Sequence, residues 1–319
     1  MYKISGGYMK KIILSFYCII FIFSFIEMGN GGSKAVAAMS YNGHWRSFHH
    51  VGKYDLDEIN LYMKSSGNKV LVEITSDYFL PESRDGIGQM QGSSIEGEVF
   101  FNSRGLAVFK YKDEYNNGQM TIQVQNDGAK ITWNGEEKSE HSFPKGTFKL
   151  YKEIAPGSNE MKKIGTFLSN FTELHFKRLN SGNLNNSDLI YFGVLHNFEN
   201  NYASTVSNSG GGKLFISKSS VEQSIYKYFN IKFKNHKTVQ GFKFNGKGYV
   251  FEGASGAPID YVKALNVYDM GSNKLVIYGE LYNPDNPAAG TYGSVDAVIK
   301  KVTEGNKTRY VLDALSVKN

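Results

Sequence analysis

Short apolar runs alternate with turn residues between residues 41 and 152. In the run 69–75 β-branched residues alternate with other residues, which is the period of a β-strand. Turn residues separate such runs about every 8–12 residues, and Asn117-Gly118 carries a strong hairpin signal. The spacing predicts an antiparallel meander of about eight strands that closes as a small barrel or folds as a sandwich. The strands are expected at 43–48, 56–63, 69–75, 94–101, 106–112, 120–125, 130–133 and 146–151.

The hydrophobic period changes after residue 153. Apolar residues recur at helical spacing over 161–171, which predicts a first helix. We expect Asp188 to N-cap a second helix over 189–198. A third helix is expected to start at Ser219, because Ser219 and Glu222 have the spacing of a capping box.

Three hairpins are predicted after the helices. A segment rich in Ser, Asn and Gly, 204–212, is expected to be a loop that precedes the third helix. Helices followed by an antiparallel meander are typical of an α+β domain with its helices on one face of the sheet. The order of elements is similar to that of NTF2-like and cystatin-like domains. The hairpins are expected at 242–251, 260–282 and 294–317.

The first 37 residues have the parts of a secretory signal peptide. Lys10 and Lys11 precede an apolar run, 12–26, and Ala35 and Ala37 supply the small residues of a cleavage site. We expect cleavage after Ala37, with Ala38 as the alternative, which would place the mature chain in the cell envelope or outside the cell. An uncleaved membrane anchor is the alternative, but the run is shorter than the roughly 20 apolar residues that span a bilayer.

The predicted signal peptide also changes the composition of the working protein. Cys18 is the only cysteine, so a mature chain would hold no disulfide. Tyr17 precedes this cysteine in the middle of the apolar run, which disfavours lipidation. A cysteine-free mature chain rich in Lys, Asn and Ile is typical of a bacterial exported protein. We predict a signal peptide at 1–37, a β-barrel-like domain at 41–152, a linker with a helix at 153–187 and an α+β domain at 188–319.

Positive charge is concentrated in the second half of the chain. The formal net charge is +6, and residues 1–37 contribute four lysines and one glutamate to it. Residues 38–152 carry 13 Lys and Arg against 15 Asp and Glu, whereas residues 153–319 carry 19 against 14. A mature chain of net charge +3 does not indicate a nucleic-acid-binding protein.

One segment is basic and contains no acidic residue. Between Gln223 and Val250 aromatic residues are interleaved with six lysines and His236. Such a segment would attract anionic polymers of the cell envelope. The alternative is that the aromatic residues face the core while the lysines only solvate the surface. The candidate contact residues are Lys227, Lys232, Lys234, Lys237, Lys243 and Lys247.

Catalytic motifs are incomplete. The segment 210–213 has Leu, not Ser or Thr, after its lysine and fails as a phosphate-binding loop. The segment 253–256 lacks the second glycine of a nucleophile turn. On a strand His44 and His50 would share one face while His49 points away. We therefore predict no catalytic residue, no metal and no cofactor.

Two resemblances add to this interpretation. Gly43-x-Trp45 on the first expected strand resembles the start of lipocalin-like (calycin) barrels, which implies that Trp45 closes the base of a barrel. Such a barrel either holds a small ligand or is filled with side chains. The segments 221–233, 249–252 and 298–302 resemble the C-terminal region of uncharacterised exported proteins of Gram-positive-type bacteria. That family implies export and no established activity.

The sequence favours an exported, non-enzymatic binding protein that contacts anionic wall polymers. A lipocalin-like carrier of a small apolar ligand is the first alternative, and a cell-surface hydrolase is the second. No nucleic-acid partner and no transmembrane segment in the mature chain are expected. No feature of the sequence indicates an oligomeric state.

Overall fold

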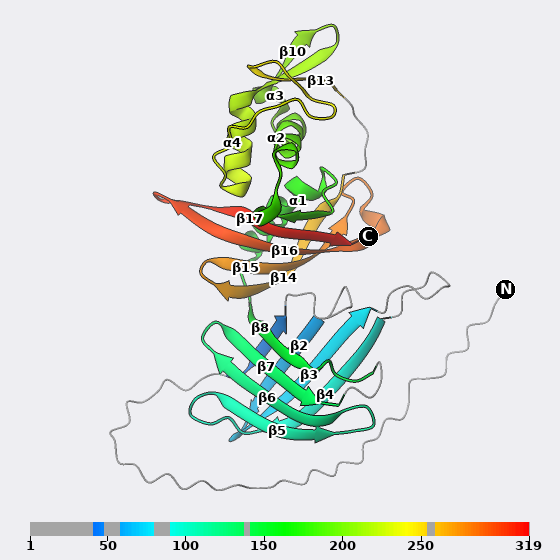
Figure 1. The fold of residues 1–319 in the computed structure, drawn as a ribbon, viewed down its shortest axis with the longest axis vertical. Coiled ribbons are helices and arrows are strands. Elements are labelled where there is room, and N and C mark those ends of the chain that lie inside the picture. Colours follow the sequence, from blue (N-terminus) through cyan, green and yellow to red (C-terminus); the bar gives the residue numbers. More distant parts are fainter. Residues whose placement is uncertain (1–40, 48–57, 80–89, 137–140, 254–258, 319) are drawn as a thin grey trace, which may run out of the picture. The chain divides into compact units, whose positions relative to one another are not determined.

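Antiparallel β-strands make up most of the structure (Figure 1). The structure is a computed structural model that describes residues 41–47, 58–79, 90–136, 141–253 and 259–318. The predicted signal peptide, with Ala35 and Ala37, lies outside these residues. All strand pairs within them are antiparallel, and the helices are few. The fold is therefore a β-rich α+β fold.

Eight strands in the first half confirm the predicted meander. Every strand pairs with a neighbour in sequence, except that β1 also pairs with β8, giving the order β4-β3-β2-β1-β8-β7-β6-β5. Among the described residues no ladder joins β4 to β5, so the sheet is open and the predicted closed barrel is not formed. The strands are β1 (Gly43–Ser47), β2 (Glu58–Ser66), β3 (Lys69–Phe79), β4 (Met90–Val99), β5 (Leu106–Lys112), β6 (Asn117–Gln125), β7 (Gly128–Gly135) and β8 (Gly146–Ile154).

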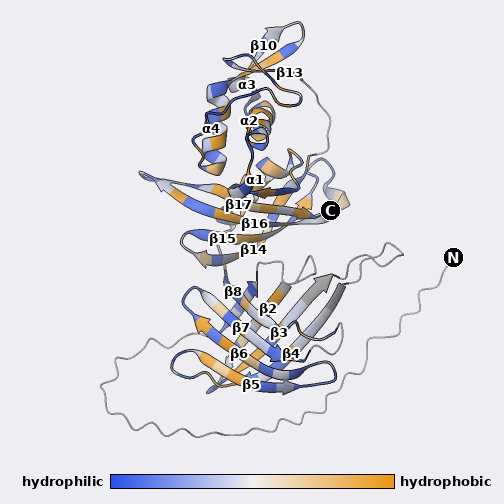
Figure 2. Cartoon of the chain, viewed as in Figure 1, coloured by the Kyte–Doolittle hydropathy of each residue, from blue (hydrophilic) through white to orange (hydrophobic). Residues whose placement is uncertain are grey.

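Alternating burial explains why these runs are strands. In β6, Met120, Ile122 and Val124 are buried, whereas the residues between them are partly exposed. Figure 2 shows the corresponding mixture of hydrophobic and hydrophilic residues along the strands. Most buried apolar side chains of this half, including Trp45 and Trp133, form one cluster.

The hairpin turn predicted at Asn117-Gly118 is wrong. Both residues lie inside β6, and the turn precedes them at Asp113, whose carboxylate accepts hydrogen bonds from the backbone N–H groups of Tyr115 and Asn116. Gly118 is needed for close approach instead, because a Cβ atom there would lie 2.3 Å from the Cα of Gly135 on β7.

The three predicted helices are present, and the second and third have N-caps other than those predicted. α2 (Asn186–Asn200) is capped by Asn185, and Asp188 is the N3 residue that completes the capping box. α4 (Lys218–Phe229) is capped by Ser217, not by Ser219. In both cases the capping residue has an extended backbone, which leaves its side chain beside the first N–H groups of the helix. The other helices are α1 (Ser158–Thr172), α3 (Tyr202–Thr205), η1 (Ser181–Asn183) and η2 (Pro287–Ala289).

No helix among the described residues is both long and apolar enough to cross a membrane. The apolar face of α1 instead packs into the protein core, with Ile164, Leu168 and Phe171 fully buried. These residues recur at the helical spacing that predicted the helix.

The second half contains two groups of strands. One group has the order β14-β15-β16-β17-β9, and β14 also pairs with β8. The other has the order β10-β11-β13-β12 and includes most of the segment predicted as a loop at 204–212. The strands are β9 (Arg178–Asn180), β10 (Val206–Gly210), β11 (Lys213–Ser217), β12 (Lys243–Phe244), β13 (Gly248–Glu252), β14 (Tyr261–Gly271), β15 (Lys274–Tyr282), β16 (Thr291–Glu304) and β17 (Lys307–Lys318).

Helices and sheet of the second half share one core. Phe192 of α2 lies at the centre of this core. Its ring centroid is 5.0 Å from that of Phe171 of α1 and 4.9 Å from that of Phe229 of α4. Buried residues of β14 to β17 belong to the same cluster. The three longer helices are therefore held by packing among themselves and against strands.

The close approach of α1 to β14 leaves no room for a side chain at position 165. A Cβ atom at buried Gly165 would lie 2.6 Å from the carbonyl oxygen of Val262. Gly165→Ala should lower the free energy of unfolding by about 1–3 kcal/mol, because the helix must move away from the strand. Urea denaturation measures this loss. Thr166→Ala, at an exposed position of the same helix, should change it by less than about 0.5 kcal/mol. Equal stability of Gly165→Ala and wild type would contradict the packing.

Candidate functional site

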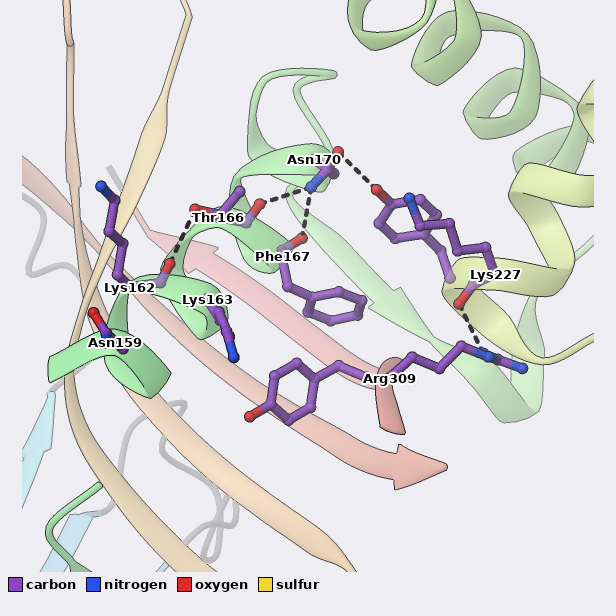
Figure 3. Close-up of a pocket in the computed structure, with 10 residues that line it drawn as sticks. Asn159, Lys162, Lys163, Thr166, Phe167, Asn170, Lys227 and Arg309 are labelled. Carbon is purple, nitrogen blue, oxygen red and sulfur yellow. Dashed lines mark hydrogen bonds between the residues drawn. The ribbon is translucent and has the colours of Figure 1, made fainter. Parts of the chain in front are cut away.

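A groove of about 500 Å³ lies between α1, the C-terminal end of α4 and β17 (Figure 3). Four cationic side chains and three aromatic rings line it, together with three uncharged polar residues. No acidic residue lines it. The cations are Lys162, Lys163, Lys227 and Arg309, the rings are those of Phe167, Tyr228 and Tyr310, and the polar residues are Asn159, Thr166 and Asn170.

Helical geometry decides which residues of α1 face the groove together. Lys163, Phe167 and Asn170 are four and three residues apart and so share one face of the helix. Lys162 is rotated from Lys163 by about 100° around the helix axis. Figure 3 shows the two lysine side chains leaving α1 in different directions. Lys163 is therefore the lysine of α1 that accompanies the ring of Phe167.

The three rings form a continuous aromatic wall. The ring centroid of Phe167 is 5.7 Å from that of Tyr228, with the planes 16° apart, and 5.8 Å from that of Tyr310. The Tyr228 hydroxyl donates a hydrogen bond of 3.0 Å to the side-chain oxygen of Asn170. The Asn170 side-chain amide donates to the backbone oxygen of Thr166 at 2.7 Å. These bonds fix the wall against α1.

Both tyrosine hydroxyls of the wall stay protonated. Burial raises the pKa of Tyr228, and the negative charge of Glu173 adds to this effect. Burial also raises the pKa of Tyr310, and its hydrogen bond to Glu160 acts in the same direction. The wall is therefore uncharged, and the charge of the groove comes from its lysines and its arginine.

Arg309 is held in place by several neighbours. Its guanidinium donates to the backbone oxygen of Lys227 at 2.8 Å, to the side-chain oxygen of Asn230 at 2.7 Å and to Glu304 at 3.0 Å. It also lies 4.8 Å from the ring centroid of Tyr226. Arg309 thus links β17 to the end of α4, and Glu304 offsets part of its charge.

The lysines of the groove have no such partners. Within the described part of the chain, no carboxylate forms an ion pair with Lys162, Lys163 or Lys227. The amine of Lys227 lies 5.0 Å from the ring centroid of Tyr228. Glu160, which accepts a hydrogen bond from Tyr310, interacts with the charge of Lys163, and Glu304 offsets part of the charge of Arg309. Acidic side chains therefore offset only part of the positive charge of the groove.

The predicted lysine segment is not one compact patch. All six lysines are exposed, but only Lys227 lines the groove. Lys234 forms an ion pair with Glu222, which lies just outside the segment in sequence. The backbone oxygen of Lys247 accepts from the N–H of Lys218 at the start of α4. Lys218 and Lys227 are about 14 Å apart along the helix axis.

Aromatic residues of the same segment point into the core. Tyr228, Phe229, Phe233 and Phe242 are buried, while their neighbouring lysines are exposed. His236 is nearly buried and bonds Glu222 at 3.0 Å and the Tyr249 hydroxyl at 2.9 Å. For most of the segment, the interleaving of aromatic residues and lysines thus reflects which side chains pack and which are solvated.

Sequence reasoning missed Lys162, Lys163 and Arg309 as groove residues. The helical spacing of Lys163, Phe167 and Asn170 was a usable signal that one face of α1 combines a cation, a ring and an amide. The approach of β17, which brings Arg309 and Tyr310, leaves no local signal in the sequence.

Of the two histidines His236 and His44, His236 contacts a carboxylate and a hydroxyl, whereas His44 contacts a carboxylate and an amide. His44 bonds Glu153 at 2.9 Å and Asn60 at 3.1 Å, so contacts occupy both ring nitrogens and no hydroxyl nucleophile is among them. His49 and His50 lie outside the described residues, as do the last residues of the 253–256 motif. No group of three metal-ligand side chains occurs in the described parts of the chain.

Another histidine lies directly behind the aromatic wall. His196 is 2% exposed, stacks on Phe192 and has its ring centroid 4.5 Å from that of Tyr228. Burial lowers the pKa of His196 from 6.5 to about 4, and the charge of Lys227 adds to the effect. The side chains of Asn200 and Asn201 each lie 3.3 Å from one of its ring nitrogens.

Comparison with known protein families, curated proteins and solved structures gave no match. The function must therefore be inferred from the geometry of the groove and from the sequence.

The buried His196 makes stability depend on pH. The pKa of His196 is about 4 in the folded chain, whereas the ordinary value of 6.5 applies to the unfolded chain. Between pH 4 and pH 6.5 the unfolded chain therefore binds more protons than the folded chain. Stability should therefore fall as the pH falls from 6.5 to 4, by about 3 kcal/mol from this residue. Urea denaturation at several pH values, compared between wild type and His196→Gln, measures this contribution.

The difference between the two proteins isolates His196 from other titrating groups. Burial raises the pKa of Glu173, which acts in the opposite direction but is present in both proteins. Parallel stability curves for wild type and His196→Gln between pH 7 and 4 would show that His196 is not a buried neutral residue.

Proposed function

We propose that this protein is an exported, non-enzymatic binding protein that contacts anionic polymers of the bacterial cell envelope. The observation that carries the proposal is the groove in which Lys163 and Lys227 meet an aromatic wall without an acidic lining residue. The excess of Lys and Arg over Asp and Glu in residues 153–319 supports the same partner. Exposed lysines at 232, 237 and 243 would extend the contact beyond the groove.

Export is supported by the sequence of the N-terminal region. Residues 1–37 combine lysines, an apolar run and small residues at Ala35 and Ala37. The resemblance of the C-terminal region to exported proteins of Gram-positive-type bacteria agrees with this localisation. An NTF2-like or cystatin-like arrangement of the second half belongs to the same proposal.

A lipocalin-like carrier of a small apolar ligand is the second candidate. Two buried polar atoms favour it, Nε1 of Trp133 and Oγ of Ser76, which have no hydrogen-bond partner among the described residues. Unpaired buried polar atoms are unusual, and a bound molecule is one way to satisfy them. The apolar cluster around Trp45 would then be the lining of the ligand site.

Binding to anionic polymers should depend on salt and on the lysines of the second half. Purified cell walls that carry wall teichoic acid should retain the protein at low ionic strength and release it near 1 M NaCl, where charges are screened within about 3 Å. A Lys232→Gln, Lys237→Gln, Lys243→Gln triple variant should bind about tenfold more weakly, because each exposed ion contact contributes about 0.2–1 kcal/mol.

A matched variant of the first half controls for net charge. Lys64→Gln, Lys110→Gln and Lys130→Gln remove the same charge from exposed positions of the β-meander and should leave retention unchanged. Retention that is insensitive to salt, or equally reduced in both triple variants, would contradict the proposed contact.

Export has its own test. The secreted protein should begin at Ala38, as determined by intact mass. Ala37→Leu should leave the longer precursor, because a bulky side chain does not fit the small-residue position of the cleavage site. Met39→Leu, a change just beyond the predicted cleavage site, should still be processed. Recovery of the uncleaved wild-type chain from the envelope would support the membrane-anchor alternative instead.

A further inference from the structure

Two unpaired ammonium groups reach the groove from different helices. Lys163 comes from α1 and Lys227 from the end of α4, and neither forms an ion pair within the part of the chain that the structure describes. Arg309 adds a third cation whose charge Glu304 partly offsets. Glu160 offsets part of the charge of Lys163, but the cationic side chains around the groove outnumber the acidic ones. This excess would attract a bound anion. The groove is therefore suited to one anionic group.

The aromatic wall is suited to a second, uncharged group. The buried Tyr228 ring supports the wall, and its hydroxyl bonds Asn170. The hydroxyl of Tyr310 is already bonded to Glu160, so Tyr310 offers the ligand mainly its ring. Phe167 lies between the two tyrosine rings, stacked on Tyr228 and tilted by 56° from Tyr310, so the apolar surface is angled. A sugar ring can lay its C–H face on such a surface, because the faces of aromatic rings are negative and C–H groups are weakly positive.

The dimensions of the groove agree with a ligand larger than a simple ion. Its volume of about 500 Å³ lies within the range of roughly 300–1,000 Å³ that is typical of small-molecule sites. The exposed side chains of Asn159 and Thr166 provide polar groups that can bond sugar hydroxyls. An anion alone would leave the aromatic wall without a contact.

We infer that the groove binds a single sugar ring that carries a phosphate or carboxylate group. Lys163 and Lys227 bind the anionic group, and the rings of Phe167 and Tyr310 support the face of the sugar. This inference rests on the proposed function, since an anionic envelope polymer would present such a sugar unit. Contact with the sugar ring would let the groove distinguish anionic sugars from other anions, which charge attraction at the protein surface alone cannot do.

Calorimetric titration of the purified protein at low ionic strength tests the inference. The probes are glucose 6-phosphate, glucuronate, inorganic phosphate, glucose and AMP. Glucose 6-phosphate or glucuronate should bind at least about tenfold more tightly than inorganic phosphate or glucose, and comparison of the two identifies the anionic group. Equal affinity for glucose 6-phosphate and inorganic phosphate, or tighter binding of AMP, would overturn the inference.

Two variants separate the roles of charge and ring. Lys163→Gln with Lys227→Gln should raise the Kd for the preferred sugar about tenfold or more. Lys64→Gln with Lys130→Gln removes the same charge at exposed positions of the β-meander and should leave that Kd unchanged. Equal Kd values for the two double variants would overturn the inference.

Removal of the aromatic ring of Phe167 should weaken binding of the sugar without changing the affinity for phosphate. Phe167→Leu should abolish the preference for the anionic sugar over inorganic phosphate, while the affinity for phosphate stays the same. Tyr310→Leu makes the same test from β17 if Phe167→Leu lowers the stability of the fold. A preference that survives in both variants would overturn the inference.

The titration tests the inference about the groove, and the cell-wall assay tests the proposed function, so their results can be told apart. Salt-dependent retention on cell walls without binding of either anionic sugar would overturn the inference about the groove and leave the proposed function intact. Binding of the sugar without retention on cell walls would overturn the proposed function alone.

Discussion

The contact between α1 and β14 is the constraint on which the groove depends. Because Gly165 has no Cβ atom, α1 can approach the carbonyl oxygen of Val262 on β14 more closely than any other residue would allow. The Ser169 hydroxyl accepts a hydrogen bond of 2.9 Å from the N–H of Val262, and the Thr172 hydroxyl donates to the backbone oxygen of Asp260 at 2.5 Å. Small and hydroxylated residues on one face thus fix the rotation of the helix. The opposite face of α1 therefore turns Lys163, the ring of Phe167 and the amide of Asn170 towards the groove.

Tyr228 connects the groove to the hydrophobic core. Its ring packs edge-on against Phe171 and Phe192 and stacks with Phe167, while its hydroxyl bonds Asn170. A ring that is 5% exposed contributes little contact area to a ligand itself. It supports the more exposed rings of the wall and holds Lys227, the next residue towards the N-terminus of α4, at the groove.

The sequence was sufficient for elements whose signal is local. Strands with one buried face and helices with an apolar stripe were predicted because alternation and helical period survive in the order of residues. Errors arose where tertiary contact decides. Gly118 looked like a turn residue but sits in a strand opposite Gly135, and Ser219 has capping-box spacing although Ser217 caps the helix. The segment 204–212 was expected to be a loop, yet most of it pairs as β10 with β11.

The candidate site, too, depends on tertiary contacts that the local sequence does not show. A run of lysines without acidic residues looks like a region of high positive potential, but potential depends on neighbours in space. Glu222 reaches Lys234 and His236, and Glu304 interacts with the charge of Lys232, so acidic residues from outside the run lower its field. The groove combines residues of α1, α4 and β17 that are far apart in sequence, and no carboxylate lines it. The charge that can act on a ligand therefore depends on which acidic side chains the fold brings close, and at the groove Glu160 and Glu304 offset only part of the cationic charge.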